Sequence, residues 1–294
     1  MALSLEGCGR IFFDGGANTG EAVDRFLAGG FYGCAMSAPY RVYPRAWPSM
    51  SARERRAAMA PLREPNSFCV RSFEPAAELM PPLLRKEGEL RRRGYDVRFI
   101  HAALGNRTAE SVPRTIVRYS DDPAAFSATT LRFADVHVGG KPRALSERSE
   151  LGRSYSVVDL VRRAVEANSS ATVAVKLDVE GAEWWAMEQL LAEPVVLCQV
   201  SYIFAEFHGS ATAAQRAKLV SYGLSEDIFE SLKRRVHAAM EQPGCKLRIY
   251  WRSFWASCGD EQRFMWRNSR QAMGSLAPAT HKARRRLHKR WSRP

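Results

Sequence analysis

Hydrophobic and polar positions follow two periods along the chain, which predict strands and helices in turn. Apolar runs of strand length cover residues 10–14, 67–75, 172–178 and 195–207, with further strands expected at 95–104, 112–119 and 246–255. Segments with helical spacing lie between them, at 21–27, 76–93, 156–167, 183–193, 212–222 and 225–240. Strands that alternate with helices, several of them nearly all apolar, predict an α/β fold with a mostly parallel sheet and helices on both faces.

Local signals refine these elements. Two adjacent prolines, Pro81 and Pro82, are expected to break the helix at 76–93, because proline lacks the N–H of a helix interior. Ser156, followed three residues later by Asp159, is typical of a helix start. The polar, Gly- and Pro-marked stretch 121–149 is expected to be loop.

Two segments interrupt the regular pattern. Residues 31–66 contain five prolines and many arginines, which favours a long surface insertion. The chain after about residue 269 has the composition of a loose basic tail. We therefore expect one domain over residues 1–268, with the insertion at 31–66, and a flexible tail over 269–294.

The formal net charge of +13 is concentrated in these segments. Residues 41–63 hold six Arg and one Glu, and residues 281–294 hold seven Lys or Arg and no acid. The rest of the chain is almost neutral. A basic tail can bind nucleic acid by counterion release, but it is also a common form of solvated chain end. The sequence contains no aromatic-and-basic motif of an RNA-binding module.

Cysteine spacing and the chain start bear on compartment. The six cysteines are scattered without a C-x-x-C pair, so we expect reduced, mostly buried thiols and neither a metal site nor a disulfide framework. No basic-then-apolar leader precedes the first strand, and no apolar run is long enough to span a membrane. The sequence thus favours a cytoplasmic location.

Four expected strands end in acidic residues at the edge where parallel sheets bind ligands. These are Asp14, Glu74, Asp178, and Glu206 with His208 close behind. A Gly-rich turn, D-G-G-A-N-T-G, follows the first strand, and glycine lets the backbone approach a ligand closely. Glu74, on the next strand, is placed to accept hydrogens from two ribose hydroxyls. The pattern indicates a nucleoside-type cofactor without required phosphate contacts.

Taken together, these motifs resemble those of the FkbM family of S-adenosylmethionine-dependent methyltransferases. The similar segments are residues 14–20, F-E-P at 73–75, H-A-A-L-G at 101–105 and K-L-D-V-E-G-A-E at 176–183, in the family's order. The similarity spans about residues 10–210. It implies a class I methyltransferase (Rossmann-like) fold, with a seven-stranded sheet that contains one antiparallel strand. It also implies methylation of a hydroxyl oxygen on a sugar, glycan or small metabolite.

The resemblance also implies residue roles. The turn, with Asp14, Gly16, Ala17, Asn18 and Gly20, would surround the methionine part of S-adenosylmethionine. Glu74 would hold the ribose, and Ala102 and Ala103 would border the adenine. The methyl-transfer pocket would be lined by Asp178, Glu180, Glu206 and His208. The insertion at 31–66 and Trp184-Trp185 depart from the family's pattern, and the insertion bears on the substrate rather than on the cofactor.

A hydroxyl acceptor must lose its proton, and the sequence offers several bases. His208 is the first candidate, because its ordinary pKa of about 6.5 suits neutral pH. Asp178 or Glu180 could serve instead, and His208 could be a structural histidine. For Glu183, a role at the helix start is the preferred interpretation.

Two other classes of function compete. A nicotinamide-dependent oxidoreductase would require G-x-G-x-x-G and an acid about twenty residues later, which the chain lacks. A non-catalytic protein of the same fold could bind nucleic acid or an acidic partner through its basic segments. RNA as the methyl acceptor would combine the two.

Overall fold

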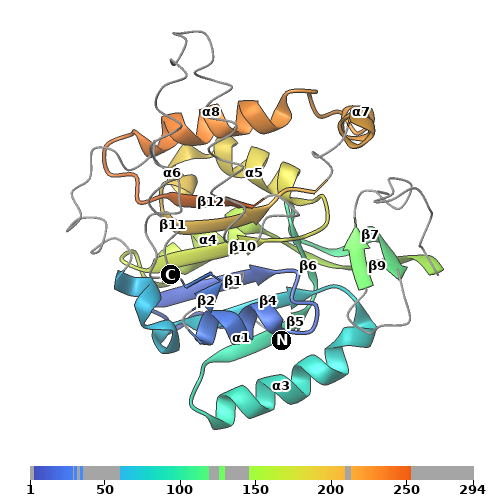
Figure 1. Ribbon diagram of the computed structural model, residues 1–294. Helices are drawn as coiled ribbons and strands as arrows, with labels where there is room; N and C mark the ends of the chain where they lie inside the picture. Colours follow the sequence, from blue (N-terminus) through green and yellow to red (C-terminus); the bar gives the residue numbers. More distant parts are fainter. Residues whose placement is uncertain are drawn as a thin grey trace, which may run out of the picture. The chain divides into compact units, whose positions relative to one another are not determined.

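The structure, a computed structural model, describes residues 3–28, 30–31, 34–35, 60–118, 126–129, 146–208 and 213–252. All of them belong to one compact unit, Met1–Trp255. The core is a six-stranded sheet in the order β12-β11-β10-β1-β4-β5 (Figure 1). Its strands are β1 (Arg10–Gly15), β4 (Cys69–Glu74), β5 (Val97–His101), β10 (Thr172–Leu177), β11 (Val200–Glu206) and β12 (Arg248–Arg252).

Every pairing within this sheet is parallel. The expectation of a mostly parallel α/β sheet is confirmed. The expectation of seven strands with one antiparallel member is not, because the described residues supply six strands in this sheet. The strand order reverses direction beside β1, between β4 on one side and β10 on the other. Open sheets of this kind bind ligands at such a reversal, beyond the carboxyl ends of the strands.

Alternate residues of the strands face two separate cores. Phe12 packs among residues of α1 (Glu21–Leu27) and α3 (Met80–Arg92), whereas Ile11 and Phe13 pack among residues of α4 (Val157–Ala167), α5 (Glu183–Ala192) and α8 (Ile228–Met240). All three strand residues are fully buried. Helices therefore cover both faces of the sheet (Figure 1), as the continuous apolar runs predict.

A second, smaller sheet lies beside the carboxyl edge of the first. It has the order β6-β9-β7-β8, formed by β6 (Ala103–Gly105), β7 (Ala109–Arg118), β8 (Phe126–Thr129) and β9 (Ser146–Ser156). The expectation of loop throughout 121–149 is wrong for β8 and the start of β9. These strands are polar, so no hydrophobic period reveals them. Their ladders are accompanied by cross-strand ion pairs, Arg114–Glu150 and Arg153–Glu110.

The remaining elements are short or peripheral. They are β2 (Gly30–Phe31), β3 (Cys34–Ala35), α6 (Pro194–Leu197), α7 (Ala213–Ser221) and the 3-10 turns Ala60–Arg63, Pro65–Ser67 and Ala77–Leu79. The expected strand at 195–207 thus begins only at Val200, after α6. The expected strand at 95–104 divides into β5 and β6, which belong to different sheets.

Helix ends show why two local expectations differ in outcome. Ser156 begins α4, and its Oγ accepts a hydrogen bond from the Asp159 amide at 3.2 Å, which confirms the expected helix start. Helix α3 is not broken at its prolines. Pro81 and Pro82 occupy its first turn, where backbone N–H groups have no partner within the helix and none is lost.

Four cysteines form two disulfides, Cys8–Cys69 and Cys198–Cys245, so the expectation of reduced thiols is wrong for them. Each bond joins the amino-terminal ends of neighbouring parallel strands, β1 with β4 and β11 with β12. The paired residues are 61 and 47 positions apart in the chain, and their Cα atoms lie 5.9 and 4.4 Å apart. Only the strand order brings them together. Disulfides persist mainly in oxidising compartments, which weighs against the cytoplasmic expectation.

Several expectations fall on other parts of the chain. Most of the insertion at 31–66 and the whole tail at 269–294, with their basic clusters, lie outside the described residues. Among the residues that are described, no helix is long and apolar enough to cross a membrane.

Candidate functional site

The Gly-rich turn after β1 is fastened to its neighbours. Gly16 has φ of +81°, and a Cβ at this position would lie 2.0 Å from the carbonyl oxygen of Asp178. The amides of Gly16 and Ala17 both donate to the carbonyl of Phe73, at 3.1 and 3.0 Å. The Asn18 amide donates to a side chain of β4, described next. These three amides of the turn are therefore hydrogen-bonded within the protein, and they do not form an anion-binding site.

Glu74 ends β4 beside this turn and is 5% exposed. Its Oε2 accepts the Asn18 amide and its Oε1 accepts the Ala76 amide, each at 2.8 Å. Burial raises the pKa of Glu74 to about 7, although the two amides and the charge of Lys176 act in the opposite direction. The carboxyl group is thus held rigidly in place and is poised to change its ionisation near neutral pH.

Lys176 lies beneath the turn, almost fully buried in β10. Its Nζ donates to the carbonyls of Gly15 and Gly16, both at 2.9 Å, and forms ion pairs with Asp14 at 3.2 Å and Asp178 at 3.3 Å. Burial on its own lowers the pKa of Lys176, but the two carboxylates outweigh it and raise the pKa above its ordinary value. Lys176 is therefore a permanent cation that connects the turn to the end of β10.

His208 follows β11 and is surrounded by carboxylates. Its Nδ1 lies 3.2 Å from Glu183 Oε1, and its Nε2 lies 3.7 Å from both Asp178 Oδ1 and Glu180 Oε2. Burial on its own lowers the pKa of His208, but the three carboxylate neighbours outweigh it and raise the pKa well above 6.5. The imidazole is therefore protonated at pH 7. The premise that made it the first candidate base, an ordinary pKa, does not hold in this fold.

Glu183 begins α5, as the sequence indicates, and also organises this cluster. It is fully buried, and its Oε2 accepts the Gly181 amide at 2.8 Å. Its Oε1 accepts the His208 amide at 2.6 Å in addition to facing the imidazole ring. The helix-start interpretation is confirmed, and the contact with His208 is a second function of the same carboxylate that only the fold reveals.

A cavity of about 400 Å³ lies at the carboxyl edge of the main sheet. The main sheet and its loops contribute Gly16, Asn18, Glu74, Asp178, Val179 and Glu180 to its lining. A second part of the lining, called the second wall below, comes from the second sheet and the segment between β6 and β7, and includes Leu104, Arg107, Pro113, Arg114, Gly152 and Ser154. Trp185 of α5 and Tyr222 complete it. Its size lies within the range of small-molecule and cofactor sites.

The fold sorts the expected site residues into two groups. Those that line the cavity are Gly16, Asn18, Glu74, Ala103, Asp178 and Glu180. The others are Asp14, Ala17, Gly20, Ala102, Glu206 and His208, which are absent from its lining. Their roles toward a ligand, direct or indirect, remain predictions.

Members of the second group support the first. Asp14 is fully buried. Its carboxylate accepts a hydrogen bond from the Ser72 hydroxyl at 2.5 Å and also forms an ion pair with Lys176. The Ala102 amide donates to the backbone carbonyl of Glu74 at 3.1 Å. Gly20, with φ of +78°, precedes α1 in the left-handed conformation. Glu206 is buried at the end of β11. These residues shape the ends of the strands from which the cavity is built.

Sequence reasoning found Ala103 of β6 but missed the rest of the wall formed by the second sheet. Arg114 and Gly152 gave no signal for a site, because the pairing of β7 with β9 that brings them to the cavity depends on the fold. For Lys176 a signal existed: a lysine inside the apolar run at 172–177 is unusual unless a buried carboxylate accompanies it.

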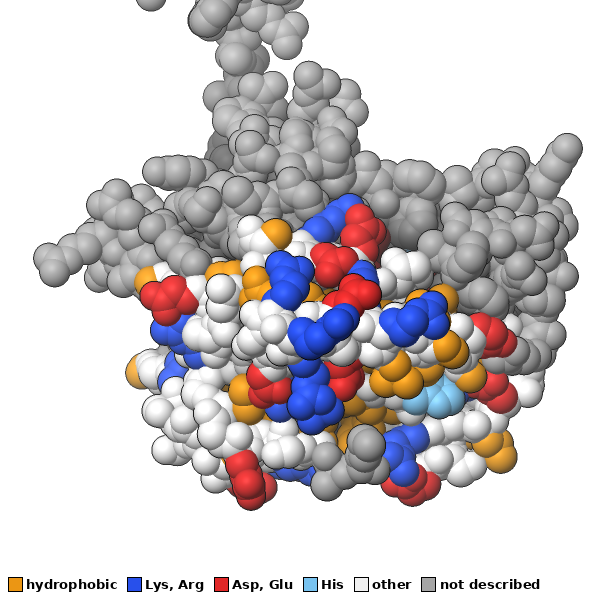
Figure 2. All heavy atoms as spheres, turned by 90° about the horizontal axis from the view of Figure 1, so that it is seen from below, with side chains coloured by type: hydrophobic (Ala, Val, Ile, Leu, Met, Phe, Trp, Pro, Cys, Tyr) orange, Lys and Arg blue, Asp and Glu red, His pale blue; other side chains and the backbone are white. Residues whose placement is uncertain are grey.

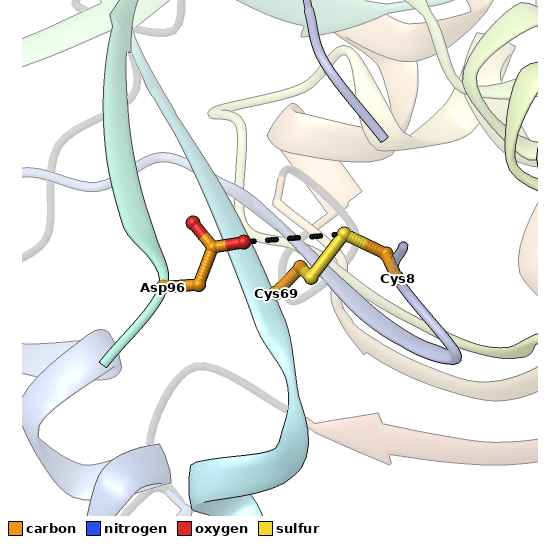
Figure 3. A group of neighbouring side chains, drawn as sticks. All are labelled: Cys8, Cys69 and Asp96. Atoms are coloured by element: carbon orange, nitrogen blue, oxygen red, sulfur yellow. Dashed lines mark hydrogen bonds between the residues drawn. A yellow bond between two sulfur atoms is a disulfide. The ribbon is translucent and has the colours of Figure 1, made fainter. Parts of the chain in front are cut away.

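A third group of side chains, Cys8, Cys69 and Asp96, lies close together on the amino-terminal side of the sheet (Figure 3). The two sulfur atoms are joined as a disulfide, so neither is a thiolate ligand. Asp96 is paired with the buried Arg71, whose Nη2 lies 3.0 Å from Asp96 Oδ2. This cation opposes binding of a metal ion, and we assign the group a structural role.

The chain was compared with protein-family models, with curated proteins and with solved structures, and none of the three comparisons finds a match.

Proposed function

We propose that the protein is an S-adenosylmethionine-dependent methyltransferase that methylates a hydroxyl oxygen of a sugar, glycan or small metabolite. The observation that carries the proposal is the placement of Glu74. Its carboxyl group ends the strand next to the Gly-rich turn, is held by the Asn18 and Ala76 amides, and lines the cavity. Each oxygen accepts one amide, which leaves further acceptor capacity for two ribose hydroxyls.

The same geometry disfavours a dinucleotide cofactor. The amides of Gly16, Ala17 and Asn18 are bonded within the protein, so the turn offers them to no pyrophosphate. Glu74 and Asp178 would also repel phosphate charge. A cationic sulfonium beside these carboxylates is the more favourable ligand, which supports S-adenosylmethionine over a nicotinamide cofactor.

The residues present fit this cofactor, which supplies a methyl group already activated by its positive sulfur. Glu74 would hold the ribose, and Gly16 would let the turn approach the ligand closely. Ala103 and Leu104 give the cavity an apolar border suited to the adenine ring. The protein's main task would be to align the acceptor, because alignment alone can lower a barrier by about 7–11 kcal/mol in favourable cases.

Removal of the acceptor's proton falls to Asp178 or Glu180. Both carboxylates line the cavity, whereas His208 is protonated and does not. S-adenosylmethionine would supply the methyl group for the acceptor's hydroxyl oxygen, and one of these two carboxylates would accept the proton that the hydroxyl loses. The imidazolium of His208, 3.7 Å from both, would orient them and balance their charge.

The test is calorimetric titration of the purified protein with S-adenosylmethionine. Glu74→Gln keeps the shape of the side chain but removes its charge, and we expect it to weaken binding by about 10- to 100-fold, the worth of one or two charge-assisted hydrogen bonds. Glu110→Gln, an exposed carboxylate of β7 outside the cavity, is the matched control and should bind like the wild type. Folded wild-type protein that does not bind, or unchanged binding by Glu74→Gln, would overturn the proposal.

The face that carries α3 gives no support to the nucleic-acid alternative. On the face that carries α3, Lys and Arg side chains lie interspersed with Asp and Glu (Figure 2). Several of them form pairs, such as Lys86 with Asp24 and Arg98 with Glu87. A face of mixed charge does not form the basic stripe that phosphate backbones require.

A further inference from the structure

The cavity has walls of opposite charge. Glu74, Asp178 and Glu180 contribute carboxylates from the main sheet. Arg107 and Arg114 contribute guanidinium groups from the wall built by the second sheet and the segment before it. A cofactor with a positive sulfur fits the first wall. The second wall therefore calls for a ligand group of the opposite charge.

Arg114 is the buried member of this wall, only 7% exposed. Its Nε and Nη2 contact Glu150 Oε1 at 2.8 and 2.6 Å, across the β7–β9 ladder. Its Nη2 also lies 3.4 Å from His101 Nε2. That nitrogen is 2.9 Å from the carbonyl of Pro75 and so carries the hydrogen of that bond, which leaves it unable to accept from Arg114. A Cβ on Gly152 would lie 2.2 Å from the Arg114 Cζ, so a larger residue there would displace this guanidinium from its position.

The Nη1 of Arg114 is a buried donor without a partner among the described residues. Buried polar groups in folded proteins are nearly always hydrogen-bonded, so a donor of this kind beside a cavity indicates a missing ligand atom. The two hydrogens of a guanidinium nitrogen suit an oxyanion better than a neutral hydroxyl.

Arg107 is the exposed member. It lines the same cavity, and the described part of the chain offers it no hydrogen bond or ion pair. Its charge is therefore available to a ligand, although exposure makes its contribution weaker than that of Arg114. Together the two groups form a cationic wall in which one carboxylate, that of Glu150, already accompanies Arg114.

We propose that Arg114 and Arg107 bind a carboxylate or phosphate group of the methyl acceptor, which is therefore a hydroxylated acid and not a neutral sugar. This inference rests on the proposed methyltransferase function. It assigns the two arginines to the acceptor's anionic group, whereas Glu74 on the acid-lined wall holds the ribose of the cofactor. Repulsion from the three carboxylates would keep the anionic group at the arginines and direct the acceptor's hydroxyl toward Asp178 and Glu180.

The test measures anion binding directly. The full chain, saturated with S-adenosylhomocysteine, is titrated with inorganic phosphate, acetate and neutral glycerol at constant ionic strength, and apparent Kd values are derived from thermal unfolding. We expect phosphate or acetate, but not glycerol, to stabilise the wild type. The anion with the lower Kd identifies the class. Arg114→Gln and Arg107→Gln should raise that Kd by at least about tenfold and about threefold, respectively, because a buried charge pair is stronger than an exposed one.

Three controls keep the result interpretable. Arg153→Gln, in β9 of the same sheet but outside the cavity, should bind anions like the wild type. If Arg114→Gln does not fold, the Kd of the anion for Arg107→Gln, a change at an exposed residue, still tests the proposal. S-adenosylmethionine affinity is measured on every variant: a wild type without affinity rejects the methyltransferase, whereas normal cofactor binding without anion binding rejects only the present inference. A loss of cofactor affinity in Arg114→Gln would assign this arginine to the cofactor and also overturn it.

Discussion

The Nδ1 of His208 lies 3.2 Å from the Oε1 of Glu183, a carboxylate that no solvent reaches. The two residues are 25 positions apart, and the carboxylate also accepts the His208 amide. Together with Glu180 and Asp178, Glu183 raises the pKa of a histidine that looks like a base in the sequence and holds it as a cation. In the proposed function, Asp178 and Glu180 are therefore the candidate bases in place of His208.

Replacing Glu183 by Gln should lower the pKa of His208, because one of the three carboxylates that stabilise the imidazolium is removed. NMR titration of the imidazole measures this change directly. Glu188→Gln is the matched control, since Glu188 lies on the same helix but pairs with the exposed Arg235. Equal His208 pKa values in both variants would contradict the assignment.

The free energy of unfolding should also depend on pH through His208. The folded state raises the pKa of His208, so its contribution is fully present below about pH 6.5, the ordinary value, and is lost as the pH rises through the folded-state pKa. Denaturant unfolding across that range should show a smaller loss of stability with pH in Glu183→Gln than in the wild type. At pH 6 the variant should also be less stable than the wild type by about 1–3 kcal/mol, because buried donors that hydrogen-bond to the Glu183 carboxylate lose an acceptor.

Cofactor binding should depend on pH through Glu74. Ribose hydroxyls donate to the ionised carboxylate, and burial raises its pKa to about 7 in the free protein. The Kd for S-adenosylmethionine should therefore rise by nearly tenfold for each pH unit below about 7 and level off above pH 8. In Glu74→Gln this dependence should vanish, and its persistence there would assign the titration to another group.

The Gly16 position can be tested against a glycine with the same backbone conformation. Gly16 and Gly94 have φ of +81° and +89°, but a Cβ would collide with the Asp178 carbonyl only at Gly16 and meets nothing within 4 Å at Gly94. Gly94→Ala should cost about 1–2 kcal/mol of unfolding free energy from backbone strain alone. Gly16→Ala should cost more and weaken S-adenosylmethionine binding. Equal losses would mean that the turn adjusts freely.

Removing a disulfide should lower the free energy of unfolding without changing the affinity for S-adenosylmethionine. Both bonds lie at the amino-terminal ends of the strands, away from the cavity. Cys69→Ser and Cys198→Ser should each lower the unfolding free energy by about 2–5 kcal/mol and leave the S-adenosylmethionine Kd unchanged. Alkylation followed by mass spectrometry should find Cys8, Cys69, Cys198 and Cys245 protected until reductant is added. Free thiols at these positions in protein isolated from its native compartment would restore the cytoplasmic expectation.

Local patterns were sufficient for much of the fold. The apolar runs that end at Asp14, Glu74, Asp178 and Glu206 became four strands of the main sheet, and their carboxyl ends meet at one edge. The start of α4 at Ser156 also follows from sequence. In each case the decisive interactions, hydrophobic burial with a period and a helix cap, lie within a few residues.

The tertiary structure decided what depends on distant partners. The polar strands β8 and β9 form because a ladder and the Arg114–Glu150 pair compensate for their missing hydrophobic period. Strand order selects the cysteine pairs, and Lys176 reaches the turn from 160 positions away. The charge of His208 and the cationic wall of the cavity have the same origin. Coulomb interactions and strand pairing depend on distances in space, and the partners here are far apart in the sequence. The sequence therefore predicts the kind of fold and the edge of the sheet that bears the candidate site. The charge state of that site and its full lining follow only from the tertiary structure.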